Sequence, residues 1–349
     1  MTSNAKRSVV CLFLLLGILS MSALAANQNR IGTSGAQELL IPVGARGIGL
    51  GPSAMVFARG AEAIYYNPAG LGRMEHGVEA MFSQMSYFAD INVSYGAIGV
   101  SAGSFGALGF TVKTISFGDI PVTTSLYPDG TGELYSPTFL TIGATYAKEL
   151  TDRISIGLTA NVVSEEMMSM SATGMAFSIG VQYQNLGIQG LALGVAIKNI
   201  GPNMKFSGSN AYITADNPAD NRDLNPYVVE MAAFAMPSHL EIGIGYSPKL
   251  DEKNQLSVGG MFRNNNYQDD EYNFGAEYGF DNMFFVRGGY TFAPETSNDV
   301  LDQRGYLYDY TLGAGINYTV GGVALSFDYA YRNMKYFDGN NVFTLKLGF

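Results

Sequence analysis

The feature that most constrains this chain is an alternation of apolar and polar side chains with a period of two. It recurs in many segments from about residue 153 to the C-terminus. Within 154–162, every second residue is apolar and the residues between are small or polar, and 341–349 repeats this pattern, ending on the aromatic Phe349. A period of two indicates a β-strand with one apolar face. The chain is therefore expected to consist largely of strands that place one face against an apolar medium.

Alternation alone does not distinguish a soluble β-sandwich from a membrane barrel, because both have one apolar strand face. Strand length and the positions of aromatic residues distinguish the two folds. Strands that cross a bilayer need about 9 to 11 residues, and tyrosines collect near their ends at the two interfaces. The strands expected here have that length, and these tyrosines lie near their ends: Tyr146, Tyr183, Tyr246, Tyr290, Tyr318 and Tyr331. We therefore predict an all-β transmembrane barrel.

The alternation predicts about 14 antiparallel strands. Their expected ranges are 78–88, 91–102, 105–117, 137–148, 153–164, 172–184, 190–200, 238–247, 254–264, 271–279, 283–293, 306–318, 322–332 and 341–349. Connections after even-numbered strands are short, whereas those after odd-numbered strands include the long segments 118–136, 201–237 and 294–305. This asymmetry predicts a bacterial outer-membrane barrel with its long loops outside and both termini in the periplasm. Residues 227–236 could form another strand, a lid over the pore or a segment that folds back toward a partner, but the even strand count favours a loop.

The N-terminus has the features of a secretory signal peptide. Lys6 and Arg7 precede an uncharged run at 9–19, and residues 23–25 (ALA) match the small-x-small pattern of a cleavage site. No later stretch reaches the roughly 18 apolar residues of a transmembrane helix. The predicted divisions are a signal peptide at 1–25, an N-terminal hatch inside the barrel at 26–77 and an outer-membrane β-barrel at 78–349.

The predicted hatch does not alternate. It begins with closely spaced glycines, includes a short helix-like stretch around 53–65, and stops at Asn67-Pro68, because proline cannot continue a helix. The glycines at 47, 49 and 51 do not have the spacing of a nucleotide-binding loop. No nucleotide cofactor is therefore expected.

Composition argues against several other classes of function. The only cysteine, Cys11, lies in the predicted signal peptide, and His76 and His239 are the only histidines. With so few cysteines and histidines, we expect no metal site, no cofactor and no Ser-His-acid catalytic set, and therefore a protein that is not an enzyme. The formal net charge of -10 argues against a nucleic-acid partner.

Two adjacent motifs resemble a known family. The stretch GARGIGLG at 44–51, followed by EAIYYNPAGL at 62–71, resembles the N-terminal signature of FadL-like outer-membrane proteins and is most similar to the PorV/PorQ family. Further likeness at 151–167, 172–184 and 197–206 extends the resemblance over most of the mature chain. It implies a fourteen-stranded barrel plugged by the hatch, surrounded by outer-membrane lipid. It also implies that Phe349 ends a strand of the kind recognised by barrel-assembly machinery.

The resemblance implies two functions. PorV-like proteins act in type IX secretion, where they hold cargo by its C-terminal domain, so we expect type IX-like secretion or cargo handling, with a translocon and secreted cargo as partners. FadL itself passes hydrophobic molecules laterally through its wall. The alternative is therefore a channel for the uptake of a hydrophobic ligand. A barrel with a purely structural role is the third hypothesis.

Two sets of residues are candidates for a site. The first matches the hatch motif residue by residue, and consists of Asn67, Pro68, Ala69, Gly70 and Leu71. We interpret it as a helix stop and tight turn, with a positive φ at Gly70, that seats the hatch against the wall; a movable gate is the functional alternative. The second set consists of charges expected to face the lumen, where we predict ion pairs between hatch and wall: Glu241, Glu277, Arg287, Asp309, Asp328 and Arg332.

Overall fold

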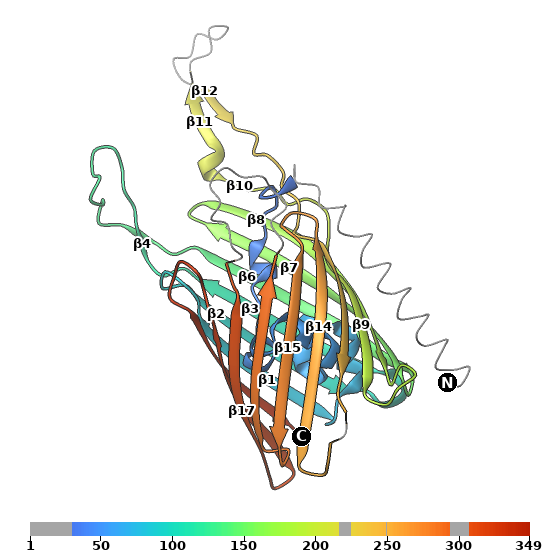
Figure 1. Cartoon of the computed structure of the whole chain (residues 1–349). Helices are drawn as coiled ribbons and strands as arrows, with labels where there is room; N and C mark the ends of the chain where they lie inside the picture. The colour runs from blue at the N-terminus through green and yellow to red at the C-terminus, as the bar shows by residue number, and fades with distance from the viewer. Residues whose placement is uncertain (1–29, 216–224, 249, 294–306) are drawn as a thin grey trace.

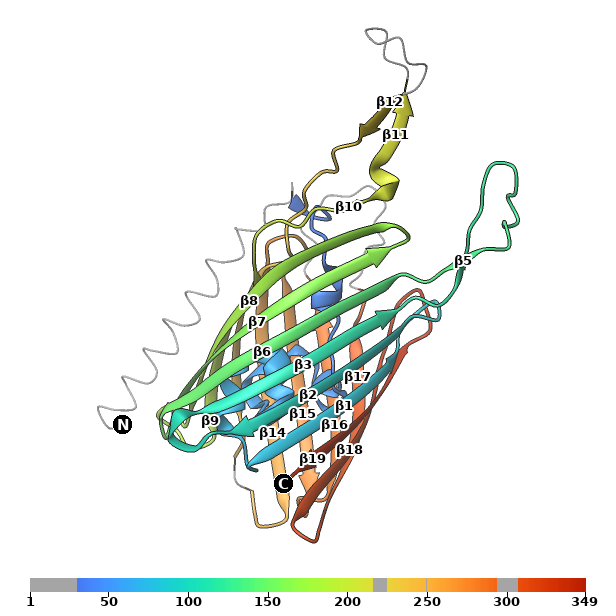
Figure 2. The same cartoon turned by 180° about the vertical axis from the view of Figure 1, so that it is seen from behind.

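The computed structural model describes residues 30–215, 225–248, 250–293 and 307–349. Fourteen long strands form one closed antiparallel barrel around an N-terminal segment of short helical turns (Figures 1 and 2). The ring closes where β1 pairs with β19 and where β8 pairs with β9. The barrel strands are β1 (Val78–Ser86), β2 (Asn92–Ser101), β3 (Ala107–Ser116), β6 (Thr138–Thr151), β7 (Ile154–Met167), β8 (Met170–Gln184), β9 (Leu191–Ile200), β13 (His239–Tyr246), β14 (Asn254–Asn265), β15 (Glu271–Phe280), β16 (Phe284–Phe292), β17 (Tyr310–Val320), β18 (Val323–Arg332) and β19 (Asn340–Gly348). The predicted fold class and strand number are confirmed.

Most strand boundaries agree with the sequence prediction within a few residues. The clearest difference is β17, which begins at Tyr310 rather than at 306. The strands β7 and β8 run beyond their expected ends, because their ladder continues to the pair Met167 and Met170, past the end of β9.

The outward faces of the strands settle the choice between a sandwich and a barrel. Phe177, Leu312 and Leu345 would be sealed between two sheets in a sandwich, yet their exposed fractions are 41%, 55% and 44%. Residues of the opposite face, such as Thr111 and Ser178, are buried inside the ring. The alternation therefore separates an apolar outer surface from a polar lumen, as in a membrane barrel.

The hatch is a series of short helical turns within the barrel. Its elements are η3 (Gln37–Leu40), α2 (Ala45–Gly49), η4 (Gly51–Ser53), α3 (Ala54–Phe57), η5 (Gly60–Glu62), α4 (Ala63–Tyr66) and η6 (Pro68–Arg73). The expected helix-like stretch at 53–65 is thus divided, because Ala58 and Arg59 are extended and Gly60 adopts a left-handed φ of 62°, which a continuing helix cannot contain. Leu50, Met55 and Leu71 are completely buried. No helix of the described residues is both long and apolar enough to cross a membrane.

The two rims of the barrel differ in their connections. At the rim that we call the loop rim, β3 and β6 are joined by a long segment with the small strands β4 (Ile120–Pro121) and β5 (Leu134–Tyr135). The connection from β9 to β13 also lies there and projects farthest (Figure 1). At the opposite rim, the turn rim, tight turns join β6 to β7 and β17 to β18. The β2–β3 connection at this rim includes η7 (Gly103–Phe105).

The described residues of the connection from β9 to β13, 201–215 and 225–238, add no further strand to the barrel ring, as the strand count predicted. Its small elements are β10 (Ser207–Gly208), η8 (Ser209–Ala211), β11 (Tyr212–Ala215) and β12 (Asn225–Val228). The segment also folds back toward the hatch: Met204 pairs with Phe234, and Ala235 pairs with Ser34 in a parallel bridge. Part of this loop therefore rests on the hatch as a lid, which was one of the alternatives.

The two ends of the described chain lie at opposite rims. The Gly32 amide donates to the carbonyl of Tyr267, which lies in the β14–β15 connection at the loop rim. The Phe349 amide donates to the carbonyl of Val78 at the turn rim. The hatch therefore runs through the barrel from one rim to the other. The N-terminus itself lies outside the described residues, so the expectation that both termini share one side stays a prediction. The predicted signal peptide lies outside the described residues.

Candidate functional site

The hatch motif begins with Asn67, whose buried side chain joins the hatch to two strands. Its Oδ1 accepts a hydrogen bond from the Ala69 amide at 3.2 Å and so caps η6. Its Nδ2 donates to the carbonyls of Val181 on β8 and Val195 on β9, at 3.0 and 3.4 Å. One amide group therefore ends α4, starts η6 and fixes both to the wall.

The rest of the motif depends on close packing. Gly70 does not have the positive φ that we expected; instead, a Cβ at this position would lie 2.2 Å from the Ala58 carbonyl oxygen. A Cβ at Gly157 on β7 would lie 2.3 Å from the Pro68 carbonyl carbon, so the wall also needs glycine here. Ala69 and Leu71 are completely buried. The motif thus forms a tightly packed contact, which we call the seat, where the backbone of the hatch lies directly against the backbone of the wall.

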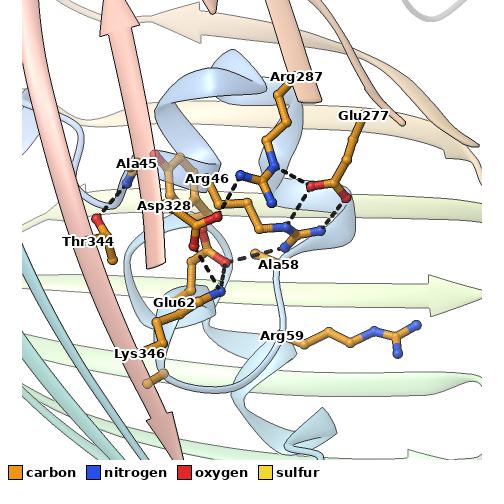
Figure 3. A network of polar contacts seen from close by, with 12 residues as sticks. Ala45, Arg46, Ala58, Arg59, Glu62, Glu277, Arg287, Asp328, Thr344 and Lys346 are labelled. Atoms are coloured by element: carbon orange, nitrogen blue, oxygen red, sulfur yellow. Dashed lines mark hydrogen bonds and ion pairs between the residues drawn. The ribbon is translucent and has the colours of Figure 1, made fainter. Parts of the chain in front are cut away.

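A network of ion pairs fixes the middle of the hatch to the wall (Figure 3). Arg46 on α2 donates two hydrogen bonds, of 3.0 Å each, to the carboxylate of Glu277 on β15. Arg287 on β16 contacts Glu277 and donates to Asp328 on β18 at 2.6 Å. The Ala45 amide next to Arg46 donates to the Thr344 hydroxyl on β19 at 2.8 Å. Three of the predicted lumen charges therefore meet in one cluster.

Glu62 of the hatch completes this cluster. Its carboxylate lies 3.3 Å from the Arg46 guanidinium and 3.4 Å from the Lys346 ammonium. Burial by itself would raise the pKa of Glu62, but Lys346 and Arg46 hold it below its usual range. The carboxylate is therefore ionised and attaches the hatch to β19.

Glu241 belongs to a second network that joins neighbouring strands. Its carboxylate lies 2.8 Å from Arg263 on β14, 3.5 Å from Lys198 on β9 and 3.3 Å from His239 on its own strand. Arg263 also contacts Glu271 at 2.8 Å. These pairs link one wall strand to another, whereas we had expected pairs between hatch and wall.

The remaining two predicted lumen charges lie at the loop rim. Asp309 precedes β17 and accepts hydrogen bonds from the Tyr310 amide and the Asn333 side chain, both at 2.7 Å. Arg332 ends β18, and its guanidinium carbon lies 3.3 Å from the centroid of the Tyr308 ring. They therefore do not join either of the deeper networks.

Arg332 lines a cavity of about 390 Å³ at the mouth of the barrel, which we call the mouth cavity. Its walls come from the hatch segment 37–42 and from strand ends around the loop rim. The apolar part of the lining includes Ile41, Phe88, Ile91, Ile115, Phe117 and Phe139. Its polar groups include Glu38, Arg263 and Glu271. A concave, mostly apolar site with a few charged groups is typical of a small-molecule pocket.

A second cavity, of about 40 Å³, lies deeper in the lumen and is called the inner cavity. Leu39, Tyr65, Lys113 and Lys198 contribute to its lining. The ammonium groups of Lys113 and Lys198 lie 5.2 and 4.7 Å from the centroid of the Tyr65 ring. No group of three or more potential metal-ligating side chains occurs in the part of the chain that the structure describes.

Several of these residues were not singled out from the sequence. Arg46 and Glu62 were missed, although charges in a glycine-rich apolar segment are a signal that they are paired. Glu38 and Lys113 were also missed, since nothing in a strand pattern shows which hatch residue a lumen-facing lysine meets.

The comparisons with known proteins identify the fold. No family model and no curated protein matches the sequence. Among solved structures, the P. putida toluene transporter TodX has a TM-score of 0.51 at 12% identity, over 83% of this chain and 94% of TodX. The Ralstonia pickettii toluene transporter TbuX has a TM-score of 0.50 at 15% identity, over 86% and 98%. A Pseudomonas aeruginosa FadL homologue has a TM-score of 0.48 at 11% identity, over 88% and 98%.

This chain shares its fold, a closed antiparallel β-barrel, with TodX and TbuX. At 15% identity or less, the likeness to TodX and TbuX establishes the shared architecture, including a helical segment that precedes the barrel strands. These neighbours are named as transporters rather than as enzymes. The narrower PorV/PorQ resemblance is not among them and stays a prediction from the sequence.

Proposed function

We propose that this protein is a non-enzymatic outer-membrane channel that admits hydrophobic small molecules. The mouth cavity is the observation that carries the proposal, because its size and aromatic lining suit a compact apolar ligand. The names of TodX and TbuX as toluene transporters support the same class of substrate. This was the alternative of our sequence analysis, and the structure favours it over secretion.

A ligand that enters the mouth cavity cannot yet cross the barrel, because the hatch occupies the lumen below this cavity. The network around Arg46 and the seat around Asn67 attach it to the wall at several points. Part of the hatch therefore has to move for a ligand to cross. In this proposal the loop rim faces outward, the outer strand faces contact outer-membrane lipid, and Phe349 is recognised during barrel assembly after residues 1–25 are removed.

The test compares two Ile→Trp variants in cells that lack other hydrocarbon channels. Ile91→Trp fills the mouth cavity, whereas Ile98→Trp lies on the outer face of β2, where Ile98 is 50% exposed. We expect uptake of radiolabelled toluene to fall several-fold with I91W and to stay unchanged with I98W at equal surface abundance. Equal uptake by wild type, I91W and cells without the protein would refute the proposal.

A PorV/PorQ-like role in handling secreted protein is the second candidate. It is favoured by apolar side chains on the projecting hairpins, among them Leu126 at 83% and Val228 at 63% exposure. Exposed apolar side chains that gather on projecting loops are typical of protein-binding surfaces. The test is cross-linking in intact cells: replacement of Leu126, Tyr127, Tyr212 and Val228 by serine should abolish a specific protein adduct. The absence of any adduct with wild type would count against this role.

A further inference from the structure

The short element η3 separates the two cavities. Gln37, Glu38 and Leu40 of η3 line the mouth cavity, whereas Leu39 of the same element lines the inner cavity. Displacement of η3 would therefore join the apolar mouth to the polar lumen. The groups that hold η3 in place decide whether this connection exists.

Two buried carboxyl groups meet where η3 contacts the wall. Glu38 is only 2% exposed, and neither of its carboxylate oxygens accepts a hydrogen bond from any group in the described residues. Its carboxyl instead faces that of Glu165 on β7, which is 5% exposed and accepts a hydrogen bond from the Ala36 amide at 3.1 Å. Two like charges in such a site repel strongly, so a pair of this kind is stable only when it shares a proton.

The neighbouring cations do not neutralise this pair directly. Lys113 on β3 is the nearest, but its ammonium donates to the backbone carbonyls of Glu38 and Ile41, at 2.6 and 2.5 Å, rather than to either carboxyl group. Lys113 therefore holds the backbone of η3, and the repulsion between the two carboxyl groups has to be relieved by a shared proton.

The other charged groups around η3 contact partners of their own. Lys198 and His239 lie beside Glu241, Arg263 lies between Glu241 and Glu271, and the Arg332 guanidinium lies over the Tyr308 ring.

We propose that the Glu38–Glu165 pair is a proton-operated latch that keeps η3 across the lumen when it is protonated and releases η3 when the shared proton is lost. Release connects the mouth cavity with the inner cavity. The latch goes beyond the proposed function, because it governs the opening of the lumen to any solute and can be measured with ions alone.

The direction of the pH dependence follows from the two positions of Glu38. Burial, and next the neighbouring Glu165 carboxylate, raise the pKa of Glu38 to about 8 in the closed arrangement. A released Glu38 in water has its ordinary pKa of 4.5. The closed form thus binds more protons between these values, so the ratio of open to closed rises with pH, by up to about tenfold per pH unit. The increase ends above a pH of about 8.

The experiment measures ion conductance of the purified full-length barrel in planar bilayers from pH 5 to 9. We expect the open probability of wild type to rise between pH 6 and 8 and then level off. Glu38→Gln should stay closed at every pH, because an amide donates to the Glu165 carboxylate and has no proton to lose. Glu166→Gln is the matched control, since Glu166 is the exposed neighbour of Glu165 on β7 and should leave the wild-type curve unchanged.

A second readout does not depend on conductance. The sequence contains no tryptophan, so Gln37→Trp on the exposed side of η3 supplies a single indole reporter. Its quenching by acrylamide should increase from pH 6 to 8 in the wild-type background and not in the E38Q background. A conductance curve that is flat in wild type, or a pH response that survives E38Q, would overturn the latch. Toluene uptake tests the proposed function separately, because a pH-insensitive barrel can still admit toluene.

Discussion

At the residue scale, Asn67 shows how one side chain joins the hatch to the wall. It caps η6 and bonds the carbonyls of Val181 and Val195. Asn67→Ala would leave these buried groups without their partner, so we expect the free energy of unfolding to fall by about 1–3 kcal/mol. The measurement is urea unfolding of the purified barrel in lipid bilayers. Asn92→Ala removes one exposed hydrogen bond, to Asp90, and should have little effect; an equal loss in both variants would contradict this role.

Arg287 tests the ion-pair network at the same scale. Its guanidinium is 2% exposed and lies between the carboxylates of Glu277 and Asp328. Arg287→Met would leave buried negative charge without its partner, which costs about 3–5 kcal/mol of folding stability. The same unfolding measurement should show almost no change for Arg153→Met, because Arg153 is exposed. Partial recovery of stability in the double variant R287M/D328N would show that the loss comes from the unpaired carboxylate.

At the scale of elements, the glycines of the strands determine where the hatch can touch the wall. A Cβ at Gly157 would lie 2.3 Å from the Pro68 backbone, whereas a Cβ at Gly96 on β2 would meet nothing within 4 Å. We expect Gly157→Ala to cost about 1–3 kcal/mol through overpacking and to loosen η6, and Gly96→Ala to be almost neutral. Limited proteolysis of the hatch in the assembled barrel checks this. Equal protection of the hatch in both variants would show that η6 does not depend on this close approach.

The same elements show what the sequence can and cannot predict. The strands were predictable because the environment of each residue alternates between the outside and the lumen, so the pattern is local. The pair of Glu277 and Arg287 is also nearly local, since these residues are opposite each other on β15 and β16. The approach of Arg46 to Glu277 depends on how the hatch folds within the closed ring. The interruptions of the hatch helices at Gly51 and Gly60 depend on it as well, and the spacing of apolar residues does not reveal them.

At the scale of the whole molecule, the barrel has two different attachments for its hatch. Ion pairs and the Asn67 seat fix the middle and the end of the hatch to the wall. The beginning of the hatch also contacts the wall at η3 and, in addition, is fixed to the lid at a bridge that joins residues 34–35 to residue 235. Opening at η3 therefore requires movement next to the lid, while the remainder of the hatch can keep its contacts.

A covalent link between lid and hatch tests this division. Ser34 and Ala235 are bridge partners, and the Gly35 amide donates to the Ala235 carbonyl at 3.0 Å. The double variant Ser34→Cys, Ala235→Cys would place two thiols opposite each other in a chain whose only natural cysteine is Cys11, in the predicted signal peptide. Under oxidising conditions we expect toluene uptake to fall to the level of cells without the protein. Reductant should restore it, because the disulfide holds the beginning of the hatch against the lid. Each single cysteine variant should transport like wild type in both conditions, and unchanged uptake by the oxidised double variant would show that passage does not require this segment to move.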